Sequence, residues 1–176
     1  MTFRLGFVTG ATPDKWAGTW HERQREPIEL VPVTQDVQED GVRTGALDMA
    51  LVRLPVERDG LHLIPLYEEL PVAVLSVDDE LTLLDELTTE DLAEKHQDWT
   101  GLTVREAVET VAAGTGVLVV PMSVARLHHR KDVTYRTVTD LPSTTVGLTW
   151  LVDNDDPRIQ AFIGIVRGRS ERSSRG

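Results

Sequence analysis

Four residues at the end of the first apolar segment have the types and the position that anion binding requires. They are Thr9, Gly10, Ala11 and Thr12. The chain around them predicts a strand followed by a helix, in which Thr12 is a good N-cap and Pro13 suits the first helical position. Backbone N–H groups in the first helical turn have no intrahelical acceptor, so those of Asp14 and Lys15 could hold a carboxylate. The turn predicts either a helix cap alone or a cap that also binds an anionic ligand.

Polar side chains also follow the second and third apolar segments. Thr34 and Gln35 come directly after Ile28–Val33, and Arg53 lies near the end of Leu47–Leu54. Ligands of open α/β sheets bind at the carboxyl ends of the strands, and the fork of donors on an arginine matches an anion. Arg53 is therefore a candidate ligand residue. The alternative is a surface arginine paired with an acidic neighbour, which a chain this acidic favours.

Three further candidates lie in the second half of the chain. Thr103 and Val104 open a predicted helix, and Met122 follows the apolar segment Val117–Pro121. These residues would line a ligand site from a second lobe. A simpler role is available to two of them, because Thr103 suits a helix cap and methionine commonly fills gaps in a core.

The remaining chemistry-bearing residues do not form a recognisable metal or catalytic site. His128 and His129 are adjacent, so they point in different directions on a helix and do not by themselves form a metal site. Asp153, Asp155 and Asp156 lack the spacing of a calcium loop and predict a turn and a helix cap. No nucleophile motif and no nucleotide-binding glycine loop is present. We therefore predict no enzyme activity, no metal and no cofactor.

The composition narrows the class of protein further. The chain has 176 residues, no cysteine and a net charge of −11, of which residues 1–166 carry −14 and the last ten +3. Such an acidic body repels phosphate, so we expect no direct DNA binding by it. Residues 168–176 are expected to be a disordered, solvated Arg/Ser tail, with contact to nucleic acid or an acidic membrane as the alternative. The absence of a signal peptide and of an apolar run of about 20 residues predicts a cytoplasmic protein outside the membrane.

The pattern of apolar residues predicts an α/β chain. Strands are expected over residues 3–8, 28–33, 47–54, 61–66, 70–77, 117–121, 133–138 and 146–152, and helices over 36–44, 89–96, 103–113 and 123–127, with others beginning near 12 and 156. Unbroken apolar runs predict strands that are covered on both faces, as in a parallel sheet. The order of elements predicts a first lobe of residues 1–76 and 146–167 and a smaller second lobe of residues 77–145. Two hinge crossings would join the lobes around a ligand cleft.

Four stretches of the sequence resemble the effector-binding domain of LysR-type transcriptional regulators. In order they read GALDMALVRLP, GLHLIPLYEELPVAVLSVDDEL, VAAGTGVLVVPMSVARL and VGLTWLVDNDDPRIQAFIGIVRG. The resemblance covers about residues 3–167. It implies a type 2 periplasmic-binding-protein fold of two α/β lobes, with a small metabolite, often an organic acid, in the cleft between them. It also implies that hydroxyls such as those of Thr9 and Thr12 contact the ligand.

The chain departs from this family in two respects. It begins directly on the first strand of the sensor, without the helix-turn-helix that binds DNA. Its second lobe is short, because only QDWTGL separates His96 from Thr103 where relatives carry further strand and helix. In relatives that segment supplies part of the second wall of the cleft, so the resemblance implies a reduced second lobe here.

Together these observations predict an effector-sensing domain of a LysR-type regulator that is present without its DNA-binding domain. It would bind a small, anionic metabolite and act in a homodimer or in a heteromer with another regulator. The alternative is a dimerisation or interaction module that has lost effector binding, with Trp16 and Trp20 either facing a partner or buried in the core. An enzyme on the same scaffold is a third alternative, for which the sequence selects no residues.

Overall fold

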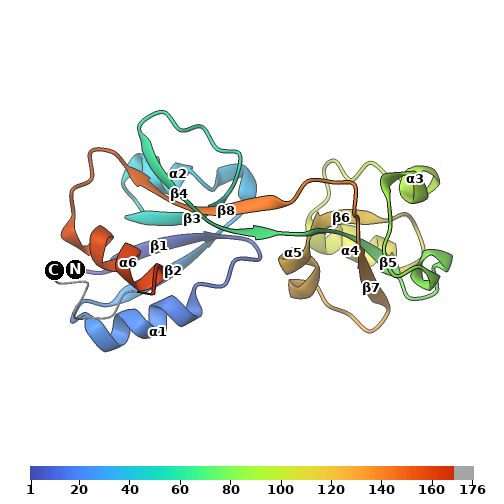
Figure 1. Ribbon diagram of the computed structural model, residues 1–176, viewed down its shortest axis with the longest axis horizontal. Coiled ribbons are helices and arrows are strands. Elements are labelled where there is room, and N and C mark those ends of the chain that lie inside the picture. The colour runs from blue at the N-terminus through green and yellow to red at the C-terminus, as the bar shows by residue number, and fades with distance from the viewer. Residues whose placement is uncertain (169–176) are drawn as a thin grey trace. The chain divides into compact units, whose positions relative to one another are not determined.

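The computed structural model describes residues 1–168. The chain forms two compact units (Figure 1). The first unit combines Met1–Tyr67 with the chain from Thr145 onward, and the second is the continuous segment Glu68–Thr144. The sequence placed this boundary at residues 76 and 77. The boundary falls earlier because β5 (Pro71–Ser76) is the central strand of the second unit's sheet and pairs on both sides within that unit. The predicted Arg/Ser tail, apart from Gly168, lies outside the described residues.

A mixed five-stranded sheet with the order β2-β1-β3-β8-β4 forms the centre of the first unit. Its strands are β1 (Phe3–Val8), β2 (Ile28–Val33), β3 (Met49–Arg53), β4 (Leu61–Glu69) and β8 (Thr144–Leu151). β1 runs parallel to β2 and β3, whereas β3 and β8 are antiparallel. The predicted parallel arrangement therefore holds for β1, β2 and β3 and does not extend to β8. Every residue of β3 is buried, as predicted, but an antiparallel neighbour permits that burial equally well.

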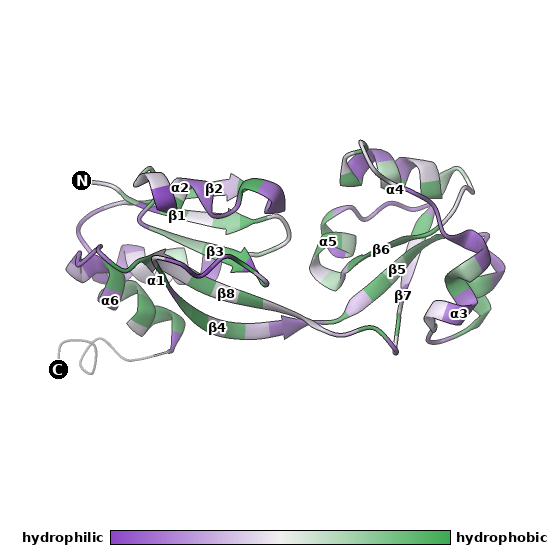
Figure 2. Ribbon diagram, turned by 90° about the horizontal axis from the view of Figure 1, so that it is seen from above, coloured by the Kyte–Doolittle hydropathy of each residue, from purple (hydrophilic) through white to green (hydrophobic). Residues whose placement is uncertain are grey.

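Two helices cover one face of this sheet (Figure 1). They are α1 (Asp14–Arg23) and α6 (Pro157–Val166), and most of α6 is hydrophobic in Figure 2. Trp20 of α1 is fully buried and stacks on Phe3 of β1, with ring centroids 4.7 Å apart. Trp16 meets Phe162 of α6 edge-on at 6.4 Å. Trp20 therefore belongs to the core and does not face a partner.

The opposite face of the sheet packs on a short helix and a loop. The helix expected over residues 36–44 is interrupted and becomes a 3₁₀ turn (Gln35–Val37) followed by α2 (Asp40–Thr44). Gly45 ends α2 with a φ of 82°, a left-handed conformation that suits glycine at this position. Val42 and Leu47 are buried in the apolar cluster on this face.

The second unit is built on a three-stranded antiparallel sheet with the order β6-β5-β7. Besides β5 it contains β6 (Leu118–Pro121) and β7 (Val133–Thr137), with the helices α3 (Thr89–Leu92), α4 (Val104–Ala112) and α5 (Met122–Leu127) and 3₁₀ turns at Glu80–Leu83 and Ala93–Lys95. α4 and α5 pack on one face of the sheet and α3 on the other. The helix expected over residues 89–96 is therefore α3 and a 3₁₀ turn in succession.

Candidate functional site

The turn after β1 joins the first strand to α1 without using Thr12 as a cap. Gly10 has a φ of 94°, which reverses the chain direction. α1 begins at Asp14, and its N-cap residue is Pro13, whose carbonyl accepts a hydrogen bond from the Ala17 N–H at 3.0 Å. The side chain of Thr12 is exposed and makes no capping hydrogen bond. The prediction that Thr12 caps the helix is wrong because the helix starts one residue later than expected.

Arg53 lies at the end of β3 and is only 2% exposed. Its Nη2 donates to the backbone carbonyl of Thr9 at 3.1 Å, and its Nη1 donates to Oε1 of Gln35 at 3.3 Å. The structure thus joins three candidate residues that are far apart in the sequence. The interpretation of Arg53 as a surface arginine is wrong, because its side chain is buried and bonds to Thr9 and Gln35.

Gln38 is a buried polar residue that the sequence interpretation missed. It is 4% exposed, its Oε1 accepts from the Arg53 backbone N–H at 2.8 Å, and its Nε2 donates to the Arg53 carbonyl at 2.8 Å. These two bonds fix the backbone of the last β3 residue and so position the guanidinium. No local pattern pointed to this role, since Gln38 lay within a segment predicted to be one continuous helix.

The other polar candidates of the first unit are less enclosed. Thr34 is exposed at the start of the 3₁₀ turn and makes no capping hydrogen bond with its side chain. The Thr9 hydroxyl is partly buried and donates to the Val33 carbonyl at 3.4 Å. Gln35 is exposed apart from its contact with Arg53. Of these three residues, Thr9, through its carbonyl, and Gln35 bond to the buried guanidinium.

The three candidates of the second unit have local structural roles. Thr103 caps α4, as its alternative interpretation predicted: its Oγ1 accepts from the Glu106 N–H at 3.1 Å and donates to the Glu106 carboxylate at 3.0 Å. Val104 and Met122 are partly buried and pack against the core between the sheet, α4 and α5. These contacts account for all three residues without a ligand.

The residues considered for metal binding are placed as turns and caps. Asp156 caps α6 by accepting from the Arg158 N–H at 2.9 Å, which confirms the predicted cap. Hydrogen bonds from the Arg158 side chain hold the pKa of Asp156 below its ordinary value. Within residues 1–168, no group of three His, Asp or Glu side chains is arranged to hold a metal ion. Over the same range, no helix has both the length and the apolarity that a membrane crossing needs.

The ends of β1 and β3 and the turn after β2 thus bring Thr9, Gln35 and Arg53 together, and the α/β sheets have the fold of type 2 periplasmic-binding proteins. Residues 15–100 match the family model described as the LysR substrate binding domain. A regulator of Bacillus subtilis (strain 168), the HTH-type transcriptional regulator AlsR, is 26% identical over 205 residues, which span 96% of this chain and 67% of that protein.

Solved structures show the same fold. The reduced form of the OxyR regulatory domain from Pseudomonas aeruginosa has a TM-score of 0.77 at 20% identity, covering 94% of this chain and 96% of that one. The BenM effector binding domain with its effector benzoate has a TM-score of 0.76 at 17% identity, covering 95% and 90%. These matches confirm the resemblance to the effector-binding domain of LysR-type regulators. The aligned stretch of AlsR exceeds the length of this chain, so AlsR carries residues that have no counterpart here.

Proposed function

We propose that this chain senses a small molecule as part of LysR-type regulation, and that its first unit binds a small carboxylate through Arg53. The observation that carries the proposal is the placement of a 2% exposed guanidinium among the ends of β1 and β3 and the turn after β2. Ligands of α/β sheets bind at these ends. BenM, which shares the fold, was solved with benzoate, and benzoate is a carboxylate.

The contacts of Arg53 explain how it would select an anion. The Thr9 carbonyl and the Gln35 amide hold the guanidinium plane in one orientation, while Gln38 fixes the backbone behind it. A pre-oriented guanidinium forms charge-assisted hydrogen bonds without first losing side-chain freedom. Thr9 and Gln35 supply further polar atoms beside it. A lysine at this position would keep the charge but lose the planar fork of donors.

Titration calorimetry with benzoate and a panel of small aliphatic and aromatic carboxylates tests this proposal. Arg53→Lys is the test variant, and Arg25→Lys is the matched control because Arg25 is exposed in the same unit. We expect saturable binding of at least one carboxylate, a dissociation constant about tenfold or more higher in Arg53→Lys, which corresponds to about 1.4 kcal/mol, and no change in Arg25→Lys. Circular dichroism establishes that both variants are folded.

Two results would count against the proposal. Equal affinity of wild type and Arg53→Lys would place the carboxylate elsewhere. Absence of binding across the whole panel would favour the alternative function, an interaction module without an effector.

A further inference from the structure

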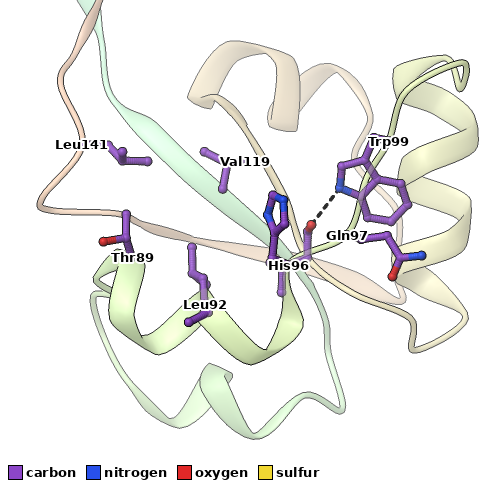
Figure 3. A pocket seen from close by; sticks show the side chains of 9 residues that line it. Thr89, Leu92, His96, Gln97, Trp99, Val119 and Leu141 are labelled. Carbon is purple, nitrogen blue, oxygen red and sulfur yellow. Dashed lines mark hydrogen bonds between the residues drawn. The ribbon is translucent and has the colours of Figure 1, made fainter.

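The second unit contains an apolar hollow beside α3 that the proposed function does not use. Its volume is about 640 Å³, and small-molecule sites in proteins have volumes of roughly 300–1,000 Å³. The lining is mostly apolar and includes Leu92, Trp99, Val119 and Leu141. Figure 3 shows Leu92 and the His96 ring on the side of α3 and the turn after it, with Val119 of β6 and Leu141 opposite. We call this cavity the α3 hollow.

The indole of Trp99 is a fixed aromatic wall of the α3 hollow. Its N–H donates to the Val117 carbonyl at 3.0 Å, which sets the orientation of the ring (Figure 3). Gly116 permits this close approach, because a Cβ there would lie 3.3 Å from the ring carbon Cζ2. The ring is only partly buried, so part of its surface is free to pack against an aromatic group. Because the indole is already held in place, a ligand would bind it at little cost in side-chain freedom.

Two exposed carboxylates next to the lining residues are held in the ionised form. Asp140 accepts hydrogen bonds from the N–H of Thr89 at 2.9 Å and from its hydroxyl at 2.7 Å, and Thr89 lines the hollow. These bonds keep the pKa of Asp140 below its ordinary value. Hydrogen bonds from Thr100 likewise lower the pKa of Asp98, which follows the lining residue Gln97. Both groups therefore carry a negative charge at neutral pH.

Nearby cations do not balance these charges. Residues 85–98 contain six Asp or Glu and a single lysine, Lys95, which is paired with Asp79 at 3.0 Å. Glu90 and Glu94 are exposed, and each directly follows a residue that lines the hollow. The lining itself includes no Lys or Arg among the described residues. A cavity with an excess of one sign of charge around it attracts ligands of the opposite sign, so the α3 hollow favours cations over anions.

We propose that the α3 hollow binds a small molecule that has an apolar body with an aromatic ring and one ammonium group. The body fills the apolar interior against Trp99, and the ammonium group stays among the surrounding carboxylates. The His96 ring and the Gln97 amide, which also line the hollow, supply polar acceptors beside it. This site lies wholly within the second unit and does not depend on Arg53. The chain would then bind ligands of opposite charge in its two units.

Three probes with the same apolar body test the proposal. Phenylbutylamine is a cation at neutral pH, phenylbutanol is neutral and phenylbutyrate is an anion. The readout is the indole N–H signal of Trp99 in heteronuclear NMR spectra of the full chain, identified as the one of four indole signals that Trp99→Phe lacks. Trp99 is the one tryptophan of the second unit, so its signal reports on the hollow and not on the Arg53 site.

We expect phenylbutylamine to shift the Trp99 signal saturably. Its dissociation constant should be about tenfold or more below that of phenylbutyrate, with phenylbutanol between them, because several exposed carboxylates each contribute a small favourable interaction with the ammonium group. Arg53→Lys should leave these values unchanged, so failure of the anion site in the first unit would be distinguishable from failure of this one.

A pair of lysine variants locates the ligand. Val119 is 42% exposed within the hollow, and Leu83 is 87% exposed on the same unit outside it. Val119→Lys and Leu83→Lys each add one positive charge to the second unit, so their difference measures the effect of its position. Val119→Lys should raise the dissociation constant of phenylbutylamine by about tenfold or more, and Leu83→Lys by less than about twofold. Circular dichroism establishes that both variants are folded.

Glu94→Gln tests the charge without altering the interior of the hollow. Glu94 is exposed, so its replacement should weaken phenylbutylamine binding by about twofold to fivefold and leave phenylbutanol binding unchanged. A Trp99 signal that does not move in excess phenylbutylamine overturns the proposal. Equal affinity for the three probes overturns the preference for a cation, and equal affinity of Val119→Lys and Leu83→Lys for phenylbutylamine overturns its placement in the hollow.

Discussion

Replacement of Gln38 by methionine is the sharpest test of how the Arg53 site is held. Methionine has nearly the length and volume of glutamine, so the change removes two hydrogen bonds with little change in packing. The Arg53 N–H and carbonyl, which now bond to Gln38 at 2.8 Å each, would remain buried without these partners. An unpaired buried group costs about 1–3 kcal/mol, so the free energy of unfolding should fall by about 2–4 kcal/mol, with some offset from apolar burial.

Urea unfolding followed by tryptophan fluorescence measures this change, since three of the four tryptophans, including the buried Trp20, belong to the first unit. Gln160→Met is the matched control, because Gln160 is exposed on α6 and its replacement should alter stability by less than about 0.5 kcal/mol. Equal unfolding midpoints for Gln38→Met and Gln160→Met would refute the reasoning. In that case the Gln38 amide would not be what fixes the end of β3.

Three other predictions concern helix caps and the conformation of glycines. Asp156→Ala should lower the free energy of unfolding by about 1 kcal/mol, because it removes the cap of α6. Hydrogen bonds from Arg158 lower the pKa of Asp156 from its ordinary 3.8, so the difference from wild type should be complete above about pH 4 and shrink as the pH falls further. Urea unfolding at several pH values measures this difference. Thr103→Val should cost about 1 kcal/mol in the same assay by removing the capping box of α4, while leaving carboxylate binding unchanged. Gly45→Ala should lower the thermal midpoint, because the φ of 82° disfavours a side chain by about 1 kcal/mol. Gly18→Ala within α1 should raise the midpoint, because alanine stabilises a helix interior by about 1 kcal/mol relative to glycine. Both glycines have open space around them, so neither change creates a clash.

The elements predicted from the sequence are those governed by local chemistry. The strands at Phe3–Val8 and Ile28–Val33 follow directly from short apolar runs bounded by glycine, proline or polar residues. The caps of α4 and α6 were predictable because Thr103 and Asp156 bond to atoms within three residues. Thr12 is not the cap because the helix begins one residue later than predicted, at Asp14, so that Pro13 occupies the N-cap position.

The features that the sequence did not predict depend on contacts between distant residues. Whether β3 has a parallel or antiparallel neighbour is decided by β8, nearly a hundred residues later in the chain. The burial of Arg53 depends on Thr9, 44 residues away, and on Gln38, whose inward direction follows from an interruption of the expected helix. The rule that ligands bind at strand ends nevertheless selected Thr9, Gln35 and Arg53. Their contact with a ligand stays a prediction.

The order of strands in the first unit has a consequence for how the chain is made. β8 lies between β3 and β4 in the sheet, yet it is synthesised after the whole second unit. During translation the continuous segment Glu68–Thr144 is complete while β3 and β4 still lack the strand that joins them. The nascent first unit therefore exposes two unpaired strand edges until the last fifth of the chain has left the ribosome, and it is this unit, not the second, that needs protection from aggregation at that stage.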